Sequence, residues 1–166
     1  MRNLLIVCNP SREDAIAAAV ELQQNLASTF GIYTISDVEI PGINKTTIAD
    51  LPDLEVAVVL GGDGTMLRAA EVAHEREIPL LGVNLGHVGF LSEVEHSKIS
   101  DVIDALVKKS YVIDPRITLG YTVERDGKVV ASGWALNEVT VEREKATMVE
   151  HFLDIESRPI SRWGCD

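Results

Sequence analysis

The amino-acid sequence predicts an α/β protein: an N-terminal layered domain with a mostly parallel sheet and flanking helices, followed by the start of an antiparallel β domain. Continuous apolar runs at residues 4–8, 56–60 and 79–83 are typical of parallel strands that are buried on both faces. Segments with a helical spacing of apolar residues lie between these runs. Beyond Asp114-Pro115 the helical spacing disappears, and short strand-like segments alternate with turn residues.

The first strand leads into the first helix. Ser11 and Asp14 have the spacing of an acidic capping box, so this helix is expected over residues 12–29. Gly31 is expected to end the helix, and residues 32–35 are expected to form a short second strand.

The same alternation continues along the chain. After the strand at 56–60 we expect a helix over residues 65–76, a strand at 79–83 and a helix over residues 99–109. The order strand, helix, strand, strand, helix, strand, helix is that of a layered α/β domain, which we assign to residues 1–114.

A second domain is expected over residues 115–166. Two tripeptides, at 125–127 and 156–158, have the composition of hairpin connections. The strands expected around them are residues 118–124, 128–134, 138–142, 149–156 and 159–163. These strands make a partial antiparallel β domain.

Composition limits the classes of function. Hydrophobic residues make up 46% of the chain, enough for a core, while 15 Lys and Arg against 26 Asp and Glu give a formal charge of -11. This acidic balance argues against a nucleic-acid partner, which needs basic residues to neutralise phosphates. The N-terminal apolar run is too short for a signal peptide or a membrane span, so we expect a cytoplasmic protein without a membrane partner.

Metal and disulfide sites are not indicated by the sequence. The two cysteines, Cys8 and Cys165, lie near opposite ends of the chain and do not suggest a disulfide framework. The four histidines lack metal-ligand spacing, so we expect no protein metal site.

A glycine-rich turn follows the strand at 56–60. The sequence Gly61-Gly62-Asp63-Gly64-Thr65 lies between a buried strand and a helix, which places it at the carboxyl edge of the sheet. Backbone N–H groups of such a turn suit phosphate or ribose oxygens, and Asp63 could accept a hydroxyl proton or hold Mg²⁺. The alternative is a tight structural turn in which Asp63 or Thr65 only caps the helix.

Two further segments carry candidate residues. Residues 82–91 form a second glycine-rich strand end, in which Phe90 either packs in the core or stacks on a base. Asn137 and Glu138 lie between apolar segments, and an amide beside a carboxylate can bind the two hydroxyls of a ribose. The alternative for this pair is an ordinary turn between strands.

Three segments together resemble the bacterial NAD kinases: "GGDGT" at 61–65, "NLGHVGFL" at 84–91 and "NE" at 137–138. The resemblance covers essentially the whole chain. It implies transfer of a phosphoryl group from ATP, or from inorganic polyphosphate, to the 2′-hydroxyl of the adenosine ribose of NAD, giving NADP. The donor is expected to carry Mg²⁺ or another divalent cation.

The resemblance also implies roles for individual residues. Asp63 corresponds to the proposed general base, and Arg68 to a basic position implicated in ligand binding, although an ordinary solvated helix residue is the alternative. Asn137 and Glu138 correspond to the pair that binds ribose hydroxyls, and Asp166 to a contact on the nicotinamide side. The full set of expected nucleotide-binding residues is Gly62, Gly64, Thr65, Arg68, Phe90, Asn137, Glu138 and Asp166. Family members are homodimers or homotetramers, so an oligomer is implied.

One departure from the family qualifies these expectations. Family members continue beyond the Cys165-Asp166 stretch with a "TPTGSTAY"-like segment, which is not present in this sequence. We therefore expect an N-terminal portion of an NAD kinase that is inactive or weakly active by itself. The alternatives are a lipid kinase of the diacylglycerol kinase type, disfavoured by "NLGHVGFL", and a non-catalytic nucleotide-binding module.

Overall fold

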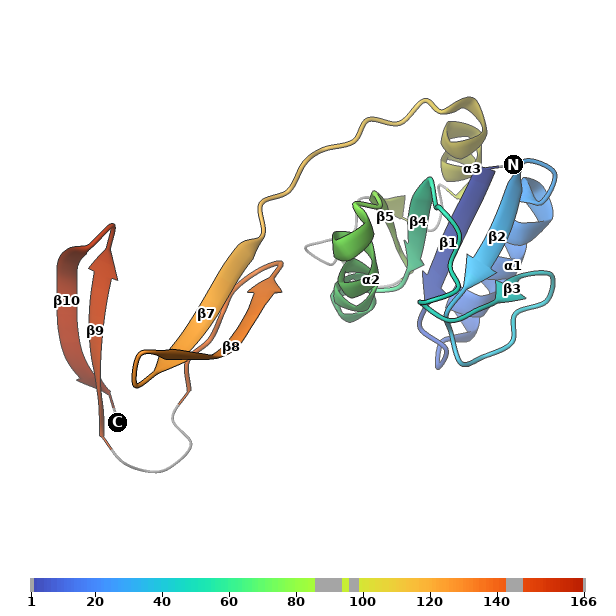
Figure 1. The fold of residues 1–166 in the computed structure, drawn as a ribbon. Coiled ribbons are helices and arrows are strands. Elements are labelled where there is room, and N and C mark those ends of the chain that lie inside the picture. The colour runs from blue at the N-terminus through green and yellow to red at the C-terminus, as the bar shows by residue number, and fades with distance from the viewer. Residues whose placement is uncertain (1, 86–93, 96–98, 143–147, 166) are drawn as a thin grey trace. The chain divides into compact units, whose positions relative to one another are not determined.

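The structure, a computed structural model, describes residues 2–85, 94–95, 99–142 and 148–165. The chain divides into two compact units, Met1–Arg116 and Ile117–Asp166 (Figure 1). Among the described residues, no helix combines the length and the apolar character that a membrane crossing requires.

Unit 1 is built on a six-stranded sheet in which every neighbouring pair of strands is parallel. Its strands are β1 (Arg2–Cys8), β2 (Phe30–Thr34), β3 (Asn44–Lys45), β4 (Val56–Leu60), β5 (Leu80–Asn84) and β6 (Val94–Glu95). Their order across the sheet is β3-β2-β1-β4-β5-β6. The helices are α1 (Glu13–Leu26), α2 (Asp63–Arg76) and α3 (Ile99–Lys108). The predicted α/β class is confirmed.

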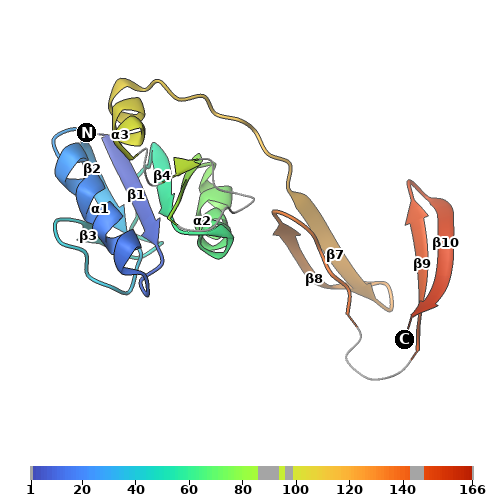
Figure 2. The same cartoon turned by 180° about the vertical axis from the view of Figure 1, so that it is seen from behind.

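Helices cover both faces of this sheet, because successive strand residues point to opposite sides. Leu4 and Ile6 of β1 pack with α1 and α3 in one apolar cluster. Leu5 and Val7 of the same strand pack with α2 in a second cluster on the other face. Figures 1 and 2 show the resulting three layers from the two sides. All the buried apolar side chains of the described residues lie in unit 1, between Leu4 and Leu106.

The first helix differs from the sequence expectation at both ends. Its N-cap is Arg12, not Ser11, because the Ser11 N–H donates to Asn9 Oδ1 at 3.0 Å in a local turn before the helix. At the other end α1 stops at Leu26, and Gly31 lies inside β2, so the prediction that Gly31 ends the helix was wrong. A Cβ at Gly31 would lie 2.8 Å from Asn3 Oδ1, so a larger residue in β2 would require the Asn3 side chain to shift.

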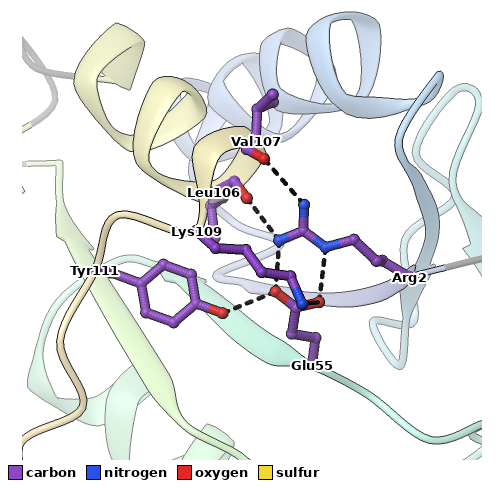
Figure 3. Close-up of polar contacts among 6 residues, drawn as sticks. All are labelled: Arg2, Glu55, Leu106, Val107, Lys109 and Tyr111. Atoms are coloured by element: carbon purple, nitrogen blue, oxygen red, sulfur yellow. Dashed lines mark hydrogen bonds and ion pairs between the residues drawn. The ribbon is translucent and has the colours of Figure 1, made fainter.

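Polar side chains form a hydrogen-bonded cluster at the amino edge of the sheet (Figure 3). Arg2 pairs with Glu55, and its guanidinium also donates to the carbonyls of Leu106 at 2.6 Å and Val107 at 3.2 Å in the last turn of α3. The Tyr111 hydroxyl donates to Glu55 Oε1 at 2.8 Å. A cation at the carboxyl end of a helix satisfies carbonyls that have no partner within the helix. The cluster therefore joins β1, the residue before β4 and the end of α3.

Unit 2 contains two antiparallel hairpins. They are formed by β7 (Leu119–Arg125) with β8 (Lys128–Ala135), and by β9 (Val149–Ile155) with β10 (Arg158–Cys165). At the first turn Asp126 and Gly127 both have a positive φ, as a two-residue hairpin loop requires. Both predicted hairpin connections are confirmed.

The strand expected at residues 138–142 is absent, and the chain there has no regular structure. Val139, Thr140 and Val141 favour an extended backbone, but no described strand pairs with them, and strand propensity without a pairing partner does not make a sheet. The hairpins of unit 2 also leave large apolar side chains exposed, among them Leu119, Val129, Phe152, Ile160 and Trp163.

Candidate functional site

The connections of unit 1 reverse direction between β1 and β4. From β1 the chain passes through α1 to β2 on one side, and from β4 it passes through α2 to β5 on the other. In doubly wound sheets, ligands bind outside the carboxyl ends of the strands at this reversal point. Here the two strands end side by side, since Cys8 pairs with Leu60 and the Asn9 N–H points to the Leu60 carbonyl at 3.4 Å.

An open cavity of about 460 Å³ lies at this reversal point. Its lining comes from the two loops that follow β1 and β4 and from the first turns of α2. The described lining residues are Asn9, Arg12, Gly62, Gly64, Thr65 and Arg68. Four of the residues expected from the sequence to bind nucleotide, Gly62, Gly64, Thr65 and Arg68, therefore lie together.

The first glycine of the turn is required by the fold. A Cβ at Gly61 would lie 2.5 Å from Thr65 Oγ1 and 2.9 Å from Thr65 Cβ, which is closer than non-bonded atoms approach. Thr65 is buried, with 7% of its surface exposed, so it has little room to move away. Gly61 thus lets the strand turn directly over the side chain of Thr65.

The other two glycines are not required by packing within the described structure. Gly62 has an extended backbone, Gly64 is helical, and an added Cβ at either position would meet nothing within 4 Å. Glycine in a helix costs about 0.5–1 kcal/mol relative to alanine, so Gly64 carries a cost that no described contact explains. A ligand that lies against the backbone of this turn would explain both residues.

Asp63 is the first residue of α2 and lies between the two cavity-lining glycines. Its side chain is half-buried, and it is not itself among the residues that line the cavity. The turn is fixed by the Thr65 and Met66 N–H groups, which donate to the Gly62 carbonyl at 3.0 and 3.1 Å. Asp63 is therefore held at the helix end, where the positive end of the helix dipole stabilises a carboxylate.

Two arginines bring positive charge to the cavity. Arg68 lies on the exposed side of α2, and Arg12 precedes α1. The Arg12 guanidinium binds the Asp14 carboxylate, and this hydrogen bonding raises the pKa of Arg12 and lowers the pKa of Asp14. Arg12 and Asp14 are consequently both charged at neutral pH.

Asn9 and Arg12 were not predicted as site residues. Their position directly after β1 is the signal that could have found them, because strand β1 ends next to β4 at the reversal point. The local residue pattern of this stretch predicts only the start of a helix.

Of the remaining predicted nucleotide-binding residues, two lie in unit 2 and two lie outside the described residues. Asn137 and Glu138 belong to unit 2, where both are exposed just after β8. Phe90 and Asp166 lie outside the described residues. Within the part of the chain that is described, no group of three or more His, Cys, Asp or Glu side chains is placed to hold a metal ion.

Comparison with known proteins identifies the family. The ATP-NAD kinase N-terminal domain matches residues 4–111, which is well over half of the chain. The chain belongs to the NAD kinase family. The predicted resemblance is thereby confirmed, and with it the assignment to a family of phosphotransferases.

Individual NAD kinases match over nearly the whole chain. The NAD kinase of Thermobifida fusca is 38% identical over 99% of this chain and 56% of its own length. That of Rhodococcus erythropolis is 35% identical over 99% of this chain and 59% of its own length. The chain thus spans a little over half the length of these relatives.

A solved structure of yeast NADH kinase complexed with NADH shares the fold. It superposes with a TM-score of 0.81 at 20% sequence identity, covering 98% of this chain and 55% of the yeast chain. At this level of identity the similarity establishes the fold alone.

Proposed function

We propose that the protein takes part in NAD kinase catalysis, transferring a phosphoryl group from ATP or polyphosphate to the 2′-hydroxyl of the adenosine ribose of NAD. The observation that carries this proposal is the cavity at the β1/β4 reversal point, in which two arginines and two unobstructed glycines lie beside Asp63. Family membership supplies the reaction class.

The chemistry of the cavity suits phosphoryl transfer. Such reactions are catalysed mainly by positioning the reactants and by stabilising negative charge on the transferred group. Arginine side chains and backbone N–H groups at the start of α2 supply the donors for that charge. Mg²⁺ enters as part of the nucleotide substrate, since this ion usually binds through substrate phosphates and one or two carboxylates.

Asp63 is proposed as the general base. A carboxylate at the end of a strand, held by the first turn of a helix, can accept the proton of the attacking hydroxyl and orient its oxygen. Gly62 and Gly64 on either side leave room for the ribose and phosphates to approach the backbone.

The acceptor side of the site is proposed from the family correspondence. Asn137 and Glu138 would bind ribose hydroxyls, with Phe90 and Asp166 as further nucleotide contacts. In this proposal residues 1–114 form the nucleotide-binding domain and residues 115–166 the partial β domain that carries the Asn-Glu pair. A homodimer or homotetramer and a cytoplasmic location are proposed on the same basis.

The test combines binding with turnover. Calorimetric titration with NAD and with ATP measures binding, and a coupled assay measures NADP formation. Because the chain is expected to be weakly active at most, NADP formation is followed with the protein in excess over NAD. Under these conditions we expect Asp63→Asn to keep both affinities within about threefold while lowering NADP formation by about a hundredfold or more, the usual contribution of a general base.

Asp101→Asn is the matched control, because Asp101 also lies in the first turn of a helix, α3, and is exposed. It removes the same charge from an equivalent position outside the cavity and should leave NADP formation unchanged. A wild-type protein that binds neither nucleotide would contradict the proposed function. Equal losses of NADP formation in Asp63→Asn and Asp101→Asn would contradict the role of Asp63.

A further inference from the structure

Arg12 is held by Asp14, in the first turn of α1, and by Leu85, which follows β5. Its Nε donates to Asp14 Oδ1 at 3.0 Å, and its Nη2 donates to Asp14 Oδ2 and to the carbonyl of Leu85, the residue after β5. A guanidinium held by two partners along its Nε–Nη2 edge has already lost most of its rotamer freedom. The side chain nevertheless remains 35% exposed, and it lines the cavity.

The contacts of Arg12 leave part of its guanidinium unused. A guanidinium carries five N–H donors, and the recorded contacts engage those of Nε and Nη2. Nη1 makes no hydrogen bond to any residue in the described part of the chain. Two charged donors therefore have no partner among the described residues, on a side chain that is already held in place.

The described cavity lining is positively charged, whereas the protein as a whole is negatively charged. The chain carries a formal charge of -11, yet the described lining holds two arginines and no carboxylate. Asp14, which compensates Arg12, is not one of the lining residues. Arg12 thus shares the cavity lining with Arg68 and with Gly62 and Gly64, at which an added Cβ would meet nothing within 4 Å.

We propose that Arg12 is a phosphate-binding residue, which binds the oligophosphate group of a nucleotide together with Arg68. This rests on the proposed function and adds to it a residue outside the glycine-rich turn. The planar fork of arginine matches phosphate oxygens, and two such forks suit a ligand with more than one phosphate group. Asp14 and Leu85 act as positioning residues that aim the fork.

The oligophosphate group that Arg12 binds can belong to ATP or to NAD. Titrations with different ligands show which of the two substrates it is. Arg12→Gln and the wild-type protein are each titrated with ATP, with inorganic tripolyphosphate and with NAD. We expect the variant to bind ATP and tripolyphosphate about tenfold or more weakly, since hydrogen bonds to a charged partner contribute on that scale. A loss confined to NAD would assign Arg12 to the pyrophosphate of the acceptor.

Lys108→Gln is the matched control for the lost charge. Lys108 ends α3, next to the Leu106 and Val107 carbonyls that Arg2 binds at the amino edge of the sheet, whereas the cavity lies at the carboxyl edge. Its only recorded partner in the described structure is the exposed Asp104. This variant should bind all three ligands as the wild type does.

Arg12→Lys tests the geometry of the fork. It keeps the charge but not the bidentate contact to Asp14, so we expect an affinity for tripolyphosphate between those of the wild type and Arg12→Gln. Thermal unfolding of each variant shows whether it is folded at the titration temperature. If Arg12→Gln is unfolded at that temperature, the affinities of Arg12→Lys and the wild type are compared instead.

Unchanged affinity of both arginine variants for all three ligands would overturn the role of Arg12 and leave the proposed function standing. A wild-type protein that binds neither ATP nor NAD would overturn both.

Discussion

Arg2 and Glu55 are joined by a bidentate ion pair, in which Arg2 Nε lies 2.7 Å from Glu55 Oε2 and Nη2 contacts Oε1 (Figure 3). The same guanidinium stacks over Phe30, with 4.2 Å between Cζ and the ring centroid. These contacts lie at the amino edge of the sheet, and the cavity lies at the carboxyl edge. Arg2 thus stabilises the fold at one edge of the sheet, whereas Arg12 and Arg68 line the cavity at the other edge, which we propose binds the ligand.

The Arg2–Glu55 pair should make stability depend on pH. Hydrogen bonding from Arg2 lowers the pKa of Glu55 from 4.5 to about 2, against the opposing effect of burial. Because the pKa is lowered in the folded state, this stabilisation is complete above pH 4.5 and is lost as the pH falls toward 2. We expect Glu55→Gln to lower the free energy of unfolding by about 2 kcal/mol at neutral pH, allowing for partial exposure of the pair.

Urea unfolding of Glu55→Gln and wild type at a series of pH values measures this effect. The difference between the two proteins should narrow as the pH falls from 4.5 toward 2. Asp104→Asn is the control, since it removes an exposed i,i+4 pair with Lys108 that contributes only a few tenths of a kcal/mol. A difference that stays constant with pH would mean that Glu55 acts through packing and not through its charge.

Substitutions of the turn glycines by alanine should change the free energy of unfolding by different amounts. Gly61→Ala places a methyl group against buried Thr65 and should destabilise the protein by about 1–3 kcal/mol, the usual cost of overpacking. Gly62→Ala introduces the same methyl group one residue later, where no described atom lies within 4 Å, so its unfolding free energy should change by less than about 0.5 kcal/mol. Equal destabilisation by both substitutions would show that the turn itself, not the Thr65 contact, requires glycine.

Local patterns predicted the strands and helices of unit 1 well where the apolar periodicity was strong. The strand at Val56–Leu60 was predicted with its observed bounds, because a fully apolar run lies between charged Glu55 and the first glycine of the turn. The two-residue strands β3 and β6 carry too little sequence for any pattern and were missed. Such short strands are set by their neighbours in the sheet, not by their own residues.

The candidate site was predicted only where its residues are adjacent in sequence. The segment from Gly62 to Arg68 supplies four of the six described lining residues; three belong to the glycine-rich motif, and the family resemblance added Arg68. Arg12 depends on a hydrogen bond to Leu85, 73 positions further along the chain, which no local pattern contains. The strand order that brings these segments together is a property of the whole sheet.

Unit 1 should fold without unit 2. The buried apolar residues of the described chain lie between Leu4 and Leu106, and a two-stranded hairpin alone is at best marginally stable. The connecting segment is open to proteases, with Val112 93% and Ile117 88% exposed. We expect limited trypsin digestion to leave a resistant fragment that ends at Arg116, identified by its intact mass.

A purified 1–116 fragment should then unfold cooperatively, with a midpoint close to that of unit 1 in the longer chain. Peptide 117–166 should show no cooperative transition. Survival of residues beyond Arg116 for as long as unit 1 would contradict this, because it would mean that the exposed apolar side chains of the hairpins are covered in solution.

Gly64→Ala should separate stability from ligand binding. Gly64 is the second residue of α2 and is exposed, so alanine should stabilise the helix by about 0.5–1 kcal/mol. The new methyl group would stand on the cavity lining, where we propose that a phosphate approaches the backbone, and it should weaken nucleotide binding by about tenfold or more. Ser100→Ala also places an alanine at the second residue of a helix, α3, away from the cavity lining, and should leave nucleotide affinity unchanged. Thermal unfolding and titration with ATP measure the two effects on the same samples. Tighter or equal ATP binding by the stabilised Gly64→Ala protein would show that the open space over this turn is not where the nucleotide lies.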